Sequence, residues 1–107
     1  MTTNTAIDMN KLREEVLSDG ADDYFGLYEI IWSLDSHYPD VSRDHKIRGA
    51  RTIALALLEE GKISLYMTVW ASNYYESVPR EDALRALRTD DAWKEPTEAP
   101  YFCYAAA

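Results

Sequence analysis

The sequence predicts an α+β domain in which three to four helices pack on a small antiparallel sheet of two or three strands. Two patterns carry this prediction. Residues 42–61 place apolar side chains at helical spacing, whereas residues 63–70 alternate apolar and other side chains with the period of two of a half-buried strand. A second run with strand composition, residues 101–107, is its natural partner. Because two strands alone are marginally stable, the helices must cover them.

Length and composition limit the remaining choices. The chain has 107 residues, 47% apolar side chains and eight tyrosines, which fits one domain spanning residues 1–107 with a flexible polar start at 1–6. The single cysteine, Cys103, cannot form an internal disulfide, and the first residues do not resemble a signal peptide. No apolar run is long enough to span a bilayer, so we expect a soluble cytoplasmic protein without a membrane partner.

The first helix is expected to begin near Ile7, with Thr5 or Asp8 as its cap, and to end at Gly20. Its buried side consists of apolar residues at helical spacing, namely Met9, Leu12, Val16 and Leu17. Gly20 is assigned to the helix end because glycine readily leaves helical geometry.

The second helix is expected to begin at Asp22 or Asp23, either of which can cap it. It should end before Pro39, since the residue before a proline is pushed out of helical geometry. Its apolar side is formed by Tyr24, Leu27, Tyr28, Ile31 and Leu34. Gly26 lies inside this expected helix, where it costs about 1 kcal/mol relative to alanine.

The long central helix has the clearest boundaries. Ser42 can accept a hydrogen bond from a free backbone N–H of the first turn, and Asp44 suits the positive end of the helix dipole. Gly61 can take the left-handed conformation that ends such a helix. The strand expected at 63–70 follows almost at once.

The segment after this strand is expected to form a loop and then a helix. Residues 71–77 are polar with two tyrosines, and Pro79 suits the first position of a helix that runs to Asp90. Two prolines in 94–100 mark a turn-rich connection to the final strand at 101–107. We expect Trp32, Trp93, Phe102 and Tyr104 to lie in the core.

The order helix, helix, long helix, strand, excursion, strand resembles that of winged-helix domains. The stretch ARTIALALLEEGKISLY is similar to the recognition helix and first wing strand of that superfamily, and the resemblance covers roughly residues 22–104. Two features depart from it: the connection 37–41 is longer than a tight helix-turn-helix turn, and the wing contains a helix. The resemblance implies a winged-helix-like fold, and winged-helix domains bind either proteins or DNA.

Charge is unevenly distributed along the chain. The formal net charge is −8, with net −7 in residues 1–40, +2 in 41–62 and −3 in 63–107. This balance argues against a general nucleic-acid binder, which needs Lys and Arg to neutralise phosphates. The basic residues of the central helix would lie at the recognition position of a winged helix and contact phosphate in a DNA-binding regulator, the alternative function: Arg43, Lys46, Arg48 and Arg51. They can equally form a solvated face paired with the acidic segments.

The acidic first half and a group of aromatic residues indicate a protein partner. Acidic side chains can steer a basic protein, as small inhibitors, immunity proteins and adaptors do, although they also serve solubility. Aromatic side chains are enriched at protein interfaces. The candidate partner-binding residues are Tyr66, Trp70, Tyr74, Tyr75, Asp22 and Asp23. A homodimer through this surface also remains open.

Catalytic and metal-binding patterns are weak. His37 and His45 lie eight residues apart across a proline, without cysteine or carboxylate neighbours at metal-ligand spacing. Cys103 lies in an apolar run typical of a buried small hydrophobe. We therefore expect no catalytic residues, no metal and no cofactor, and a non-enzymatic protein-binding module as the function.

Overall fold

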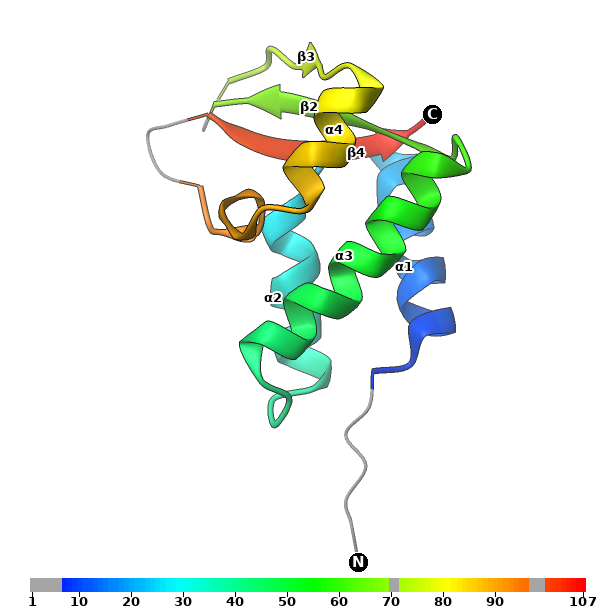
Figure 1. Ribbon diagram of the computed structural model, residues 1–107, viewed down its shortest axis with the longest axis vertical. Helices are drawn as coiled ribbons and strands as arrows, with labels where there is room; N and C mark the ends of the chain where they lie inside the picture. The colour runs from blue at the N-terminus through cyan, green and yellow to red at the C-terminus, as the bar shows by residue number, and fades with distance from the viewer. Residues whose placement is uncertain (1–6, 70–71, 97–99) are drawn as a thin grey trace, which may run out of the picture.

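The computed structural model describes residues 7–69, 72–96 and 100–107, in which four α-helices pack on a four-stranded antiparallel sheet (Figure 1). The helices are α1 (Met9–Asp22), α2 (Leu27–His37), α3 (Arg43–Glu59) and α4 (Arg80–Leu87), and the 3₁₀ helix η1 (Asp90–Trp93) follows α4. The strands are β1 (Phe25–Gly26), β2 (Ile63–Thr68), β3 (Glu76–Ser77) and β4 (Tyr101–Ala106). The α+β class is thus confirmed, with one strand more than the two or three expected.

The central helix and the strand after it form as their local signals indicate. The Ser42 hydroxyl accepts a hydrogen bond from the backbone N–H of His45 at 3.2 Å, which caps α3. Gly61 has a φ of 74°, the left-handed conformation that the exit from the helix requires. β2 then pairs antiparallel with β4 along six residues, from Ile63 opposite Ala106 to Thr68 opposite Tyr101.

The order of strands in the sheet is β1-β4-β2-β3, so β4 lies between β1 and β2. Phe25 and Gly26 pair with Tyr104 and Cys103, and β3 pairs with Tyr66 and Met67 in the second half of β2. These two outer strands are two residues long. A segment of that length cannot display an alternating pattern, which is why the sequence did not predict them.

The boundary between α1 and α2 differs from the prediction. α1 continues through Gly20 to Asp22. Gly20 does not end the helix but makes room for the ring of Tyr104, since a Cβ atom there would be 2.7 Å from Cε2 of that ring. α2 begins at Leu27, not at Asp22 or Asp23. Gly26, expected inside the helix, is instead in β1 and precedes the first turn of α2.

The core lies between the helices and one side of the sheet. Its largest fully buried side chains are Trp93 and Tyr104, which donate hydrogen bonds to the carbonyl oxygens of Leu87 and Val16, respectively. Trp32, expected in the core, is 47% exposed because it lies on the outer side of α2. None of the helices in the described ranges combines the length and apolarity that a bilayer crossing needs.

Candidate functional site

One side of the sheet is lined by tyrosines. In the pairing of β2 with β4, Leu65 lies opposite Tyr104 and both are buried in the core. The next pair, Tyr66 opposite Cys103, points to the other side because successive strand residues alternate. We call this surface the tyrosine face; it consists of Tyr24, Tyr28, Tyr66, Tyr75 and Tyr101 around Cys103.

The rings of the tyrosine face contact one another in two groups. Tyr24 stacks on Tyr75 with 3.8 Å between ring centroids and 5° between planes, and it meets the ring of Tyr66 edge-on at 5.0 Å. Tyr28 makes edge contacts with Tyr101 at 5.8 Å and with Trp32 at 4.8 Å. Such contacts between aromatic rings contribute about 0.5–1.5 kcal/mol each beyond the area they bury, so the face is a defined surface and not a set of loose side chains.

The tyrosine face is separate from the hydrophobic core. Tyr28 and Cys103 are buried, but they do not belong to the cluster of core side chains that the helices share with the sheet. Tyr24 is 38% exposed, and Tyr66, Tyr75 and Tyr101 are half-buried. The rings therefore cover Cys103 themselves while they keep apolar surface in contact with water.

The Cys103 thiol is unsuited to nucleophilic chemistry. Burial raises its pKa to about 12, and the negative charges of Glu29 and Asp23 act in the same direction. Because the thiolate is the reactive form, the side chain stays protonated and inert at neutral pH. This agrees with its interpretation as a buried small hydrophobe.

The structure brings together part of the predicted partner-binding set. Tyr66 and Tyr75 both contact Tyr24, and the adjoining Asp23 accepts a hydrogen bond from the backbone N–H of Tyr24 at 2.7 Å. Asp22, also in that set, is exposed at the end of α1. Sequence reasoning missed Tyr24, Tyr28 and Tyr101.

Two predicted residues fall elsewhere. Tyr74 is 69% exposed and lines a shallow hollow of about 170 Å³ beside Met67 and Val69, apart from the stacked rings. Trp70 lies outside the described residues. Alternation along β4 could have placed Tyr101 on the same side as Cys103, whereas Tyr24 and Tyr28 lie outside β2 and β4 and had no such signal.

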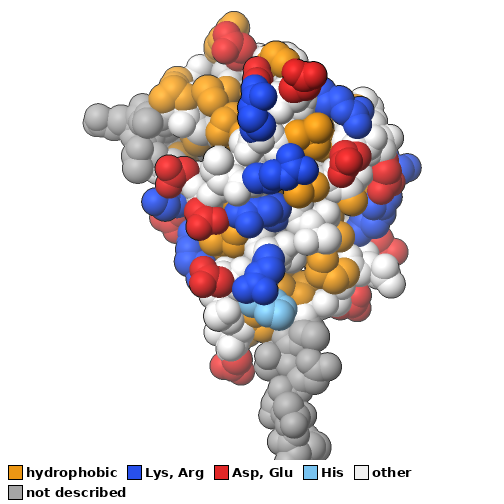
Figure 2. All heavy atoms as spheres, viewed as in Figure 1, with side chains coloured by type: hydrophobic (Ala, Val, Ile, Leu, Met, Phe, Trp, Pro, Cys, Tyr) orange, Lys and Arg blue, Asp and Glu red, His pale blue; other side chains and the backbone are white. Residues whose placement is uncertain are grey.

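The basic residues proposed for DNA contact do not form one free surface. Lys46 is buried, and its ammonium pairs with the carboxylate of Asp35 at 2.8 Å. Arg51 is half-buried and donates to Leu87 O at 3.0 Å and to Asp90 at 2.8 Å. Figure 2 shows Lys and Arg side chains over α3 and α4, with acidic and apolar side chains among them. Of the four, only Arg43 and Arg48 are exposed.

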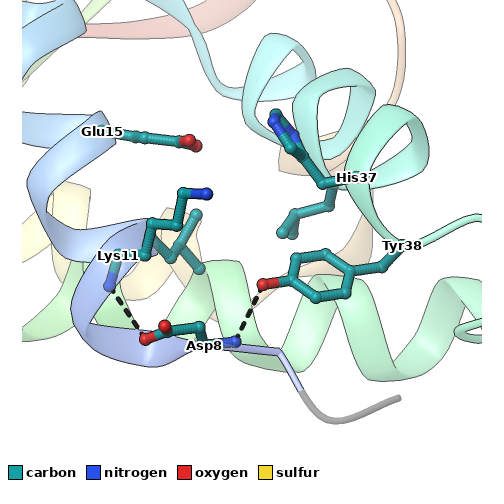
Figure 3. A pocket seen from close by; sticks show the side chains of 7 residues that line it. Asp8, Lys11, Glu15, His37 and Tyr38 are labelled. Atoms are coloured by element: carbon teal, nitrogen blue, oxygen red, sulfur yellow. Dashed lines mark hydrogen bonds between the residues drawn. The ribbon is translucent and has the colours of Figure 1, made fainter.

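A small pocket lies between α1 and the end of α2. Figure 3 shows Glu15, Lys11 and His37 pointing toward the same space, with Tyr38 below them accepting a hydrogen bond from the backbone N–H of Asp8 at 3.0 Å. The pocket holds about 10 Å³, room for about one water molecule, so it is too small for an organic ligand. Within the described ranges, no three His, Cys, Asp or Glu side chains lie close enough together to hold a metal ion.

Comparison of the chain with models of protein families, with curated proteins and with solved structures gave no match. What the chain does must therefore follow from its own residues. Among the surfaces formed by the described residues, the tyrosine face is the one that combines aromatic contacts, partial exposure and a separate position from the core.

Proposed function

We propose that the chain is a small, acidic, non-enzymatic cytoplasmic module that binds a protein partner through the tyrosine face. The observation that carries the proposal is the stack of Tyr24 on Tyr75 at a surface where the rings remain partly exposed. Aromatic side chains supply large contact areas with few rotatable bonds, and they dominate the residues that carry binding energy at interfaces. Inhibitors, immunity proteins and adaptors are the classes that fit this size and charge.

A winged-helix relationship remains part of the proposal. The order of elements supports it, with α3 at the recognition position and α4 and η1 within the excursion between β2 and β4. Arg51 of α3 donates hydrogen bonds to Leu87 and Asp90 of that excursion, so part of the surface of this helix already contacts the rest of the domain. That contact favours a protein-binding member over one that reads DNA.

Photo-crosslinking tests the proposal without disturbing the tyrosines. Ser77 is exposed, and it lies on the tyrosine face because it is paired with Tyr66. A chain with p-benzoylphenylalanine in place of Ser77 is irradiated in native lysate, the adduct is identified, and the complex is rebuilt from purified proteins. The matched control carries the same group in place of Thr52, an exposed residue of α3. We expect one stoichiometric protein adduct from position 77 and none from position 52.

The DNA-binding alternative makes the opposite prediction. Adducts formed only from position 52 would contradict the proposal. Duplex DNA binding that is lost in the Arg43→Glu, Arg48→Glu double variant would move the site to α3, because these are the exposed members of the basic set. Arg51→Glu is not a fair test, since it also breaks hydrogen bonds inside the domain.

A further inference from the structure

We propose that the partner presents arginine side chains to the tyrosine face, where guanidinium groups stack on the phenol rings and pair with carboxylates beside them. This inference rests on the proposed function and specifies the chemistry of the partner. It is carried by the positions of three acidic residues, Asp23, Glu29 and Glu95, which we call the rim acids.

Each rim acid is held by one hydrogen bond to one of its two carboxylate oxygens. Asp23 Oδ1 accepts from the backbone N–H of Tyr24 at 2.7 Å, and Glu29 Oε2 accepts from that of Gly26 at 2.7 Å. Glu95 Oε1 accepts from Nε1 of Trp32 at 2.8 Å. In each case one oxygen is fixed by the domain, and within the described residues no hydrogen bond engages the second oxygen.

The hydrogen bonds of the rim acids place them along the tyrosine face: Asp23 at Tyr24, Glu29 at Gly26, which lies opposite Cys103, and Glu95 at Trp32, whose ring contacts Tyr28. Burial is the main cause that raises the pKa of Tyr75, and the charge of Asp23 adds to it. Burial also raises the pKa of Tyr28, and the charges of Glu29 and Glu95 add to it. The acidic neighbours that act on Cys103 at the centre are Glu29 and Asp23. The rings therefore lie in a region of negative potential.

Within the part of the chain that the structure describes, none of the rim acids forms an ion pair. Within the described residues, the ion pairs shorter than 4.0 Å involve other acids, namely Glu60, Asp35, Asp90, Asp82 and Asp91. Oriented carboxylates left without a counter-charge beside exposed aromatic rings are complementary to a positively charged partner.

The same charges exclude two other occupants of an aromatic sheet surface. Single-stranded nucleic acid also stacks on such rings, but its phosphates need a positively charged groove. A second copy of the chain would bring two sets of rim acids together, and like charges placed opposite one another at an interface cost several kcal/mol. A basic protein segment meets neither obstacle.

Arginine fits this surface better than lysine. Its planar guanidinium stacks on an aromatic face and offers several N–H donors to a carboxylate at once, whereas the lysine ammonium is a compact, strongly hydrated charge. Tyr24 presents one ring face to Tyr75 and is 38% exposed, and Asp23 adjoins it in the chain. A guanidinium on the outer side of Tyr24 can reach that carboxylate.

Three synthetic peptides that differ only in one residue type test the inference. Each alternates glycine with arginine, lysine or citrulline, the last being a neutral isostere of arginine. Binding to the full chain is measured by titration calorimetry at low and at physiological ionic strength. We expect the arginine peptide to bind about fivefold more tightly than the lysine peptide, and the citrulline peptide not to bind.

Amide variants isolate the rim acids. Asp23→Asn, Glu29→Gln and Glu95→Gln together keep the oxygen that accepts each internal hydrogen bond and remove the charge. The matched control, Glu14→Gln with Glu59→Gln and Glu81→Gln, removes the same number of charges from exposed positions elsewhere. We expect the rim variant to weaken arginine-peptide binding at least about tenfold and the control by less than about twofold.

Several results would overturn the inference. Equal weakening by both triple variants would mean general charge attraction, and equal affinity for arginine and lysine peptides would remove the stacking argument. Self-association of the chain that the arginine peptide blocks would assign the face to a second copy. If position 77 crosslinks a protein but no arginine peptide binds, the proposed function stands and this inference fails; if neither occurs, both fail.

Discussion

The ring of Tyr104 rests on the backbone of Gly20, so closely that a Cβ atom at this glycine would lie 2.7 Å from Cε2 of the ring. Tyr104 is fully buried and its hydroxyl donates to Val16 O at 3.0 Å, so the ring cannot swing aside without losing this bond. These two contacts join strand β4 directly to helix α1.

Gly20→Ala should therefore destabilise the domain. Overpacking of this kind costs about 1–3 kcal/mol, which outweighs the gain of about 1 kcal/mol in helix propensity. The control is Gly49→Ala in α3, where the nearest atom is the flexible end of Ile7 at 3.3 Å and little change or slight stabilisation is expected. Urea unfolding measures both; a Gly20→Ala variant as stable as Gly49→Ala would contradict the close packing.

Neutralising Asp35 should lower the stability of the domain more than neutralising its ion-pair partner Lys46. Only 6% of the Lys46 side chain is exposed, so Asp35→Asn leaves a nearly buried ammonium without a counter-charge. Since Asp35 itself is half exposed, we expect a loss of about 1–2 kcal/mol. Lys46→Met keeps the apolar stem and should stay within about 1 kcal/mol of the parent. The control is Asp40→Asn, which neutralises another exposed acid. An equal loss of stability in this variant would contradict the explanation by the unpaired ammonium of Lys46.

Asp19→Asn should stabilise the domain at neutral pH. Partial burial, with the charges of Glu15 and Asp22, raises the pKa of Asp19 above its ordinary value. The folded state then holds its proton to a higher pH than the unfolded state, so stability falls as the pH rises through the window just above about 4. The gain in melting temperature should be present at pH 7 and absent at about pH 3, where the carboxyl is protonated in both states.

The control for Asp19 is Glu14→Gln, which removes an equal charge from an exposed position of α1. It corrects for the general benefit of lowering the net negative charge. If both variants gain equally at neutral pH, the local environment of Asp19 is not the cause.

Cys103 should resist thiol reagents in the native domain. With its pKa at about 12, only about one thiol in 10⁴ is ionised at pH 8, compared with roughly a tenth or more for an ordinary cysteine. Reaction with a chromogenic aromatic disulfide should be at least about 1000-fold slower in buffer than in concentrated urea. Labelling as fast as that of the unfolded chain would contradict burial under the tyrosine rings.

Local signals in the sequence were sufficient for the central part of the fold. Ser42 and Gly61 mark the limits of α3 because capping and left-handed geometry depend on a few neighbouring atoms. They were not sufficient at Gly20, since the reason for a glycine within the helix is a ring more than 80 residues later in the chain. β1 could not be predicted for the same reason, because Phe25–Gly26 forms a strand only by pairing with β4, which lies far away in the sequence.

The candidate site was predicted in part. Tyr66 and Tyr75 were identified because they lie near one another in the sequence, at the strand and the loop after it. The sequence pattern places Tyr24 in a helix and Tyr101 in the final strand, and it contains no signal that connects either residue with them. Only the pairing of β4 between β1 and β2 brings these segments to one surface.

That pairing also sets the order in which the domain can form during synthesis. Strands β1 and β2 each use β4 as their neighbour, so neither is paired with the other before β4 arrives. A nascent chain can form α1, α2 and α3 from local contacts, but its sheet stays open until residues 101–106 have left the ribosome. Until then the edge of β2 that pairs with β4 is unpaired, and unpaired strand edges are prone to aggregation.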